Sequence, residues 1–195
     1  GLVAADSDKL TGLTQVFNSA NVLGANLSTL SVSAYTLDPS VSGNYIVNTT
    51  TTASGTINKA IITISTSNVT KTYDGSFTAS GTAVVTSGTL YTNASNSNTL
   101  DSLSGGTFAF TNANAGSNKT VTVSGVTVND GNSGNNYTVT YANNTTSTID
   151  KATLTIRAVT DTKTYTGTTA SSATPTYTGL VAADSDKLTG LTQVF

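Results

Sequence analysis

The sequence predicts an all-β protein, and three observations carry this prediction. Thr and Val, which favour extended backbone, are abundant, and turn-forming Ser, Asn, Asp and Gly make up most of the remainder. Straight-chain helix formers are scarce, because the chain has no Glu and no Met. Short apolar runs alternate residue by residue with polar ones, which is the period of a half-buried strand.

Two runs show this period most clearly. In residues 59–64 (KAIITI), the side chains of Ala60, Ile62 and Ile64 are expected on one face. Residues 151–159 (KATLTIRAV) repeat the pattern, so a second half-buried strand is expected there.

Two longer runs change parity partway. In residues 121–128 (VTVSGVTV) the alternation slips across Ser124 and Gly125. Residues 30–37 slip at the corresponding place, across Ser33 and Ala34. Because one extra residue in a strand shifts the faces in this way, a bulge or bend is expected in both runs.

The remaining elements follow from turn residues and from the last apolar alternations. Residues 129–135 (NDGNSGN) are rich in Asn and Gly and predict a turn. A last long strand is expected to begin at Tyr137 and end at Ile149, with a counterpart that begins at Tyr45 and ends at Ile57.

Composition limits the possible functions. The formal net charge of −2 provides no basic patch, so no nucleic-acid partner is expected. No apolar run is long enough to insert into a membrane. Without His or Cys, the usual catalytic triads, thiol chemistry and common zinc sites are excluded. We therefore expect no enzymatic activity, no catalytic residue and no cofactor.

The chain begins and ends with the same phrase, GLVAADSDKLTGLTQVF, at residues 1–17 and 179–195. Identity at every position does not come from a shared fold alone, because folds tolerate many sequences. The repetition predicts a tandem array of which this chain is a window, or chains that complete one another head to tail. Each end is then expected to expose apolar strand faces.

Shorter motifs recur 92 positions apart and divide the chain into modules. KTYDG at 71–75 matches KTYTG at 163–167, and TINKA at 56–60 matches TIDKA at 148–152. Three domains are therefore predicted: residues 1–58 are the C-terminal part of a split module, 59–150 a complete module, and 151–195 the N-terminal part of the next. The junction at residues 149–152 contains no Gly, Pro or Ser, so a stiff end-to-end rod is expected.

The order and spacing of KTYDG, Asn114-Ala115-Gly116, Gly134–Tyr137 and TIDKA resemble YDG-type repeats. YDG-type repeats are related to MBG repeats, and both occur in large bacterial surface proteins similar to filamentous-haemagglutinin adhesins. The resemblance implies tandem β-modules with a β-grasp-like fold, and a stalk role. Because the sequence shows no clear helix, an immunoglobulin-like sandwich is an equal alternative. Its motif residues here are Tyr73, Asp74, Gly75, Tyr165 and Gly167. Because Thr166 replaces Asp74 in the second copy, the aspartate is dispensable, and both motifs are interpreted as turns rather than chemical sites.

Acidic residues near turns give weak candidates for calcium ligands. Asp6 with Asp8, and Asp130 with Asn132, offer carboxylate and amide oxygens, but calcium prefers six to eight oxygen ligands. The favoured interpretation is a set of solvated turns without metal.

Two functions follow. The first is a structural repeat of a secreted bacterial adhesin or extracellular filament, in a fibre or biofilm matrix at the cell surface, whose partners are neighbouring modules or copies of itself. The second is a module that binds host or matrix glycans. Tyr91, in the loop 91–96 that has no counterpart in the other module type, is the candidate contact for the second.

Overall fold

The computed structural model describes residues 1–93 and 99–195. They form two compact units: the first contains residues 1–63, 85–104 and 127–140, and the second contains 64–84, 105–126 and 141–195. The all-β prediction is confirmed, since the described helices are single turns: η1 (Ala4–Asp6), α1 (Pro39–Ser42) and η2 (Ala182–Asp184). None of the described helices has the length and apolar character needed to span a membrane.

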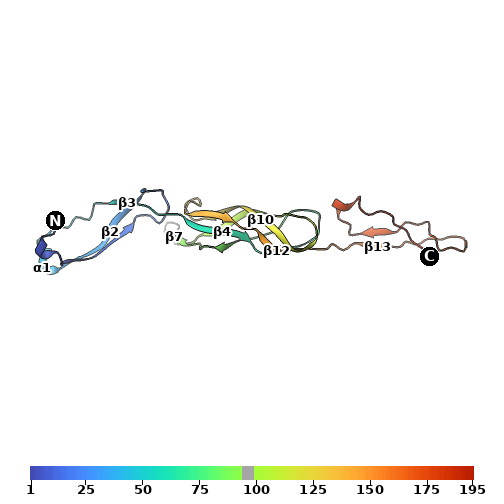
Figure 1. Cartoon of the computed structure of the whole chain (residues 1–195), viewed down its shortest axis with the longest axis horizontal. Helices are drawn as coiled ribbons and strands as arrows, with labels where there is room; N and C mark the ends of the chain where they lie inside the picture. The colour runs from blue at the N-terminus through green and yellow to red at the C-terminus, as the bar shows by residue number, and fades with distance from the viewer. Residues whose placement is uncertain (94–98) are drawn as a thin grey trace. The chain divides into compact units, whose positions relative to one another are not determined.

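The N-terminal part of the first unit is an antiparallel sheet (Figure 1). Its strand order is β1 (Leu10–Phe17), β2 (Ser28–Leu37) and β3 (Ala53–Gly55). Thr14 and Gln15 are adjacent, but their partners are Ala34 and Val32, so Ser33 is an extra residue on β2. The bulge that the parity slip predicted in this strand is confirmed.

A second sheet lies mostly in the first unit. Its order is β11 (Tyr137–Tyr141), β4 (Ala60–Thr66) and β6 (Ala83–Ser87). Beside it in the sequence, β7 (Thr92–Asn93) pairs antiparallel with β8 (Thr99–Leu100). On β4, Ile62 and Ile64 are fully buried, whereas the intervening Ile61 is 70% exposed. The period-two prediction for this run is confirmed.

The second unit contains most of a four-stranded sheet. Its order is β5 (Thr70–Thr72), β12 (Asn144–Asp150), β10 (Gly116–Asn129) and β9 (Ser102–Phe110). Figure 1 shows β10 and β12, which are antiparallel, side by side. A core cluster packs here, made of Val69, Ala79, Phe110, Val121 and Ile149.

The predicted slip in β10 occurs at Gly125. This residue has φ of 65°, a left-handed conformation that glycine adopts without strain. Val123 before it and Val126 after it are both buried, so the change of parity keeps the valines inside. The bend is confirmed.

The prediction of one long strand from Tyr137 to Ile149 is wrong. The segment forms two strands, β11 and β12, in different sheets. The amide of Asn144 donates to the carbonyl of Thr66 (3.2 Å) and its oxygen accepts the N–H of Thr146 (3.0 Å), so this side chain redirects the backbone. In the counterpart from Tyr45 to Ile57, only β3 is a strand.

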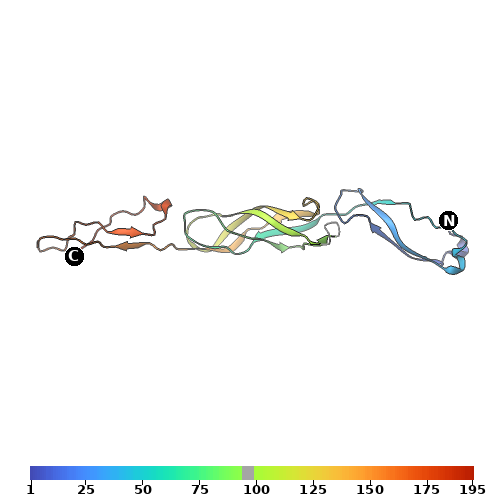
Figure 2. The ribbon, with the colours of Figure 1, turned by 180° about the vertical axis from the view of Figure 1, so that it is seen from behind.

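The C-terminal part of the second unit contains the hairpin of β13 (Thr155–Arg157) and β14 (Thr176–Thr178), visible from behind in Figure 2. The half-buried strand expected over residues 151–159 is present only as these three residues of β13. Leu154 and Ile156 are 41% and 49% exposed, because β14 pairs with one edge and covers neither face.

Burial is concentrated between Ile62 and Ile149. All described hydrophobic residues of the buried core fall in this range. Outside it, large apolar side chains such as Leu13, Ile46 and Val194 are exposed. The prediction of exposed apolar faces toward both ends is confirmed.

Candidate functional site

The KTYDG motif folds into a turn that the Lys71 ammonium closes. This group donates to the Asp74 carboxylate (2.7 Å) and to the Ser76 carbonyl (2.8 Å). Asp74 also accepts the Ser76 N–H (2.8 Å), and Gly75 has φ of 77°. The hydrogen bond from Lys71, followed by those from Ser76, lowers the pKa of Asp74 to about 2.

The KTYTG motif forms a similar turn without the carboxylate. The Lys163 ammonium donates to the carbonyls of Thr168 (2.6 Å) and Ala170 (3.0 Å). Gly167 has φ of 71°. The Thr166 hydroxyl lies 3.1 Å from that of Thr168, so hydroxyl contacts replace the aspartate.

The two lysines also occupy matching positions over aromatic rings. The Lys71 nitrogen lies 5.5 Å from the centre of the Phe110 ring, and the Lys163 nitrogen lies 5.2 Å from that of Phe195. These are cation–π distances. The segment 151–195 therefore reproduces part of the arrangement seen around the KTYDG turn.

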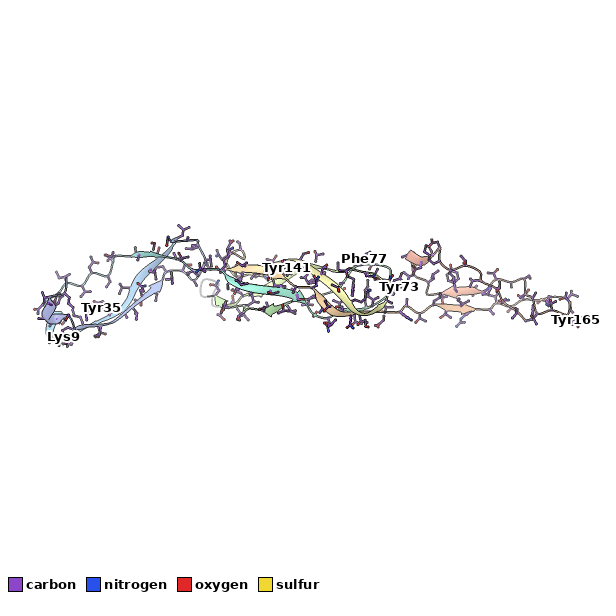
Figure 3. The ribbon with its side chains drawn as sticks, viewed as in Figure 1. Lys9, Tyr35, Tyr73, Phe77, Tyr141 and Tyr165 are labelled. Atoms are coloured by element: carbon purple, nitrogen blue, oxygen red, sulfur yellow. The ribbon has the colours of Figure 1, made fainter. Side chains whose placement is uncertain are left out.

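Tyr73, at the tip of the first turn, lines a pocket in the second unit with a volume of about 350 Å³. The Asp184 carboxylate lines the same pocket and raises the pKa of Tyr73. Figure 3 shows the position of Tyr73. The other lining residues are Asn114, Ala115, Lys151, Ala152, Leu154, Gly179, Leu180 and Val181.

A second pocket, in the first unit, has a volume of about 390 Å³. The Tyr137 hydroxyl at this pocket donates to Asp101 (2.6 Å) and accepts the backbone N–H of Tyr91 (2.9 Å). Burial, reinforced by the hydrogen bond to Asp101, raises the pKa of Tyr137 to about 12. The other lining residues are Ala20, Val22, Ile57, Asn58, Ala60, Thr92, Asn93 and Asn136.

The two pockets are built from equivalent positions of the repeated sequence. Ala60 and Ala152 each close a TIxKA motif and line one pocket each. Gly88 and Gly179 follow these motifs at similar distances, with φ of 83° and 85°. A Cβ at Gly88 would clash with the backbone oxygen of Ile61, and a Cβ at Gly179 would clash with that of Thr153. These two oxygens belong to equivalent residues of the repeat. The two pockets therefore occupy equivalent places in the repeated sequence.

A third tyrosine–aspartate pair lies in the N-terminal sheet region. The Tyr45 hydroxyl donates to Asp6 (2.6 Å) and accepts the N–H of Val3 (3.2 Å), as Tyr137 does with Asp101 and Tyr91. The bond to Asp6 raises the pKa of Tyr45. Sequence reasoning missed this pair, although Gly-Asn-Tyr at residues 43–45 and Gly-Asn-Asn-Tyr at 134–137 were a signal for it.

The two copies of the repeated phrase contact different segments. In the first copy, β1 pairs with β2, which follows it in the chain. In the second copy, Val194 bridges to Ala170 and the Phe195 N–H donates to the Thr169 carbonyl (2.8 Å), so its partners precede it.

Strand β9 makes both kinds of contact at once. It neighbours β10, which follows it, in the four-stranded sheet. Its residue Ala109 bridges to Thr78, and the Phe110 N–H donates to the Phe77 carbonyl (2.7 Å). Phe77 and Thr78 are the residues 92 positions before Thr169 and Ala170.

The calcium candidates do not converge on one point. Asp6 is engaged with Tyr45, and Asp8 forms an exposed ion pair with Lys9 (3.4 Å). Within residues 1–93 and 99–195 there is no group of three side chains suited to hold a metal ion.

Asp130 instead organises the turn at 129–135. Its carboxylate accepts the N–H groups of Asn132 (2.8 Å), Gly134 (2.8 Å) and Asn136 (2.9 Å). Burial opposes ionisation, but these hydrogen bonds outweigh it and lower the pKa of Asp130. The Asn132 amide nitrogen donates to the Val22 carbonyl (3.1 Å), which ties the turn to the pocket wall.

Tyr91, the candidate glycan contact, is 57% exposed and lines the second pocket. Residues 94–96 of the segment 91–96 lie outside the described residues. Its neighbour in the pocket, the Asp101–Tyr137 pair, was not predicted from the sequence.

The geometry thus places a tyrosine beside an aspartate in each of the two pockets. A YDG domain is found at residues 58–147, which include the KTYDG turn, Asp101 and Tyr137. The resemblance to this domain family is confirmed for that part of the chain. No match to the chain was found among curated proteins or among solved structures.

Proposed function

We propose that this chain is a structural stalk or fibre repeat of a secreted bacterial adhesin or extracellular filament. The main support for the proposal is that the two identical segments, residues 1–17 and 179–195, contact different parts of the chain. One copy pairs with the segment that follows it, the other contacts the segment that precedes it, and β9 in the YDG domain makes both contacts. Repeated half-modules of this kind suit tandem, end-to-end assembly.

The partners in this proposal are neighbouring repeat modules or further copies of the chain, arranged head to tail in a rod. The location is the bacterial cell surface or a secreted matrix. The exposed apolar side chains of residues 1–58 and 151–195 support such contacts, because exposed strand faces and edges favour pairing with another chain.

Small-angle X-ray scattering of the full chain tests the stalk role. A compact chain of this length has a radius of gyration of about 16 Å. At a dilution where the chain is monomeric, we expect a clearly larger value together with a folded β-type circular dichroism spectrum. A folded chain with a value close to the compact one would contradict the proposal.

Glycan binding is the second candidate, and exposure of Tyr91 beside a pocket favours it. A glycan array with the full chain tests it. Reproducible binding that is lost in Tyr91→Ala and kept in Tyr35→Ala, an exposed tyrosine on β2, would favour this function. Absence of binding would leave the stalk role.

A further inference from the structure

The second pocket contains a buried carboxylate oxygen that lacks a hydrogen bond. Asp101 is 3% exposed, and its Oδ2 accepts the Tyr137 hydroxyl (2.6 Å). Its Oδ1 is buried and has no hydrogen-bond partner among the described residues. Leaving such an oxygen unpaired costs free energy, so the site favours a donor that reaches it.

The repeated phrase identifies the kind of donor. Asp6 and Asp184 are the same residue of the phrase. Asp6 accepts the hydroxyl of Tyr45, the tyrosine of a Gly-Asn-Tyr motif. Asp184 lines the first pocket together with Tyr73, the tyrosine of a KTYxG turn. One aspartate position is therefore found beside both classes of tyrosine. Asp101 holds the first class, Tyr137, and its second oxygen is unpaired.

Tyr165 is the counterpart of Tyr73, and it is 91% exposed at the tip of its turn (Figure 3). We propose that Tyr165 of a second copy of this chain enters the pocket and donates its hydroxyl to Oδ1 of Asp101. The ring would then lie against Val22 and Ala60, which correspond to Ala115 and Ala152 beside Tyr73. This inference rests on the repeat role proposed above and names the contact that joins the repeats.

The contact requires an exchange of the repeated phrase. The wall of the second pocket includes Val22 and Ile57, which belong to the half-module that follows residues 1–17. The incoming copy is the one that supplies Tyr165, and the receiving copy is the one that supplies the pocket. Segment 151–178 of the incoming copy therefore packs on residues 1–17 of the receiving copy. It releases residues 179–195 of its own chain. Because the two phrases are identical, the interactions that the incoming copy breaks within itself form again with the receiving copy.

Gln193 shows which hydrogen bonds are exchanged. Its amide donates to the Val159 carbonyl (2.9 Å) and to the Ser171 hydroxyl (3.0 Å), and its oxygen accepts the Val159 N–H (2.9 Å). Gln15, the same residue of the first copy, is exposed and makes no side-chain hydrogen bond with the described residues. In the exchanged assembly Gln15 takes over the three bonds.

Sedimentation equilibrium of the full chain over a range of concentrations tests the tyrosine contact. We expect the wild-type chain to self-associate and Tyr165→Phe, which removes only the hydroxyl, to weaken association by roughly tenfold or more. Tyr165→Ala should weaken it further. Tyr177→Phe, in β14 of the same segment, is the matched control and should leave association unchanged.

The two glutamines test the exchange with identical substitutions. Gln15→Ala should weaken association by about tenfold, because it removes bonds made only between copies. Gln193→Ala should strengthen association by a similar factor, because it weakens the competing interactions within one chain. The double variant should lie close to the wild type.

Three results would overturn the inference: a wild-type chain that stays monomeric, a Tyr165→Ala variant that associates normally, or equal effects of the two glutamine substitutions. Tyr165 is almost fully exposed, so its variants should melt like the wild type. The scattering test of the stalk role uses the monomer, so a failure of that role is distinguishable from a failure of this contact.

Discussion

Residues 1–17 and 179–195 have the same sequence but only partly the same structure. Both copies form the same 3-10 turn, η1 and η2, with similar extended residues before it, Val3 at φ −71°, ψ 153° and Val181 at φ −67°, ψ 137°. Beyond the turn they differ. Residues 10–17 form β1, whereas residues 188–195 have a single bridge, at Val194.

The difference separates local from tertiary causes. The turn needs hydrogen bonds within a few residues only, such as the Asp6 N–H to the Val3 carbonyl (3.0 Å) and the Asp184 N–H to the Val181 carbonyl (2.9 Å), so both copies adopt it. The strand needs a partner for its backbone groups. The first copy has β2 beside it, and the second contacts Thr169 and Ala170 instead.

The largest expected effect on stability comes from the most buried tyrosine–aspartate pair, Tyr137 with Asp101. Tyr137→Phe leaves the Asp101 carboxylate without any described hydrogen bond, and we expect a loss of roughly 2–4 kcal/mol of unfolding free energy in urea titrations. The matched variant Tyr45→Phe should cost about 1 kcal/mol or less, since water reaches the partly exposed Asp6. Equal losses would show that burial does not distinguish the pairs.

Alkaline pH should act through the same pair. The folded state raises the pKa of Tyr137 from 10.0 to about 12, so the unfolded state releases this proton first. The stability that Tyr137 contributes is therefore complete below about pH 10 and is lost as pH rises through about 12. Urea midpoints from pH 9 to 12 should fall more steeply for the wild type than for Tyr137→Phe. Urea midpoints that fall equally with pH in the wild type and in Tyr137→Phe would contradict a raised pKa for Tyr137.

A smaller effect is expected from the glutamine that the two phrases share. In dilute monomer, Gln193→Ala should reduce the hydrogen-exchange protection of the Val159 amide by roughly tenfold, because it removes the acceptor of that N–H. Gln15→Ala should leave protection in β1 unchanged. A loss of protection in β1 would mean that Gln15 already has a partner in the monomer.

The smallest effect is expected from a chelator. The Asp130 carboxylate holds three backbone N–H groups, and Asp6 holds Tyr45, so these turns should not depend on calcium. The melting temperature of the full chain should change by less than about 1 °C when a chelator is added, within the shift that a fraction of a kcal/mol produces. A larger drop would place a metal at one of these aspartates.

Several features were predictable because they depend on neighbours in sequence. The buried faces of Ile62 and Ile64 follow from the two-residue period of a strand, and the bulge at Ser33 and the bend at Gly125 follow from its interruption. The family resemblance likewise came from motif order along the chain, and the YDG domain at residues 58–147 agrees with it.

Other features required contacts between distant residues. The sequence contained Asp101 and Tyr137 but no sign that a hydroxyl would join them across 36 positions. It also predicted one strand where Asn144 turns the chain from β11 into β12 by bonding to Thr66. Composition and periodicity thus determined the all-β class, the strand faces and the repeat. Tertiary structure alone decided the pairing of each copy of the phrase, because an extended strand leaves its hydrogen-bonding groups for whichever segment lies beside it.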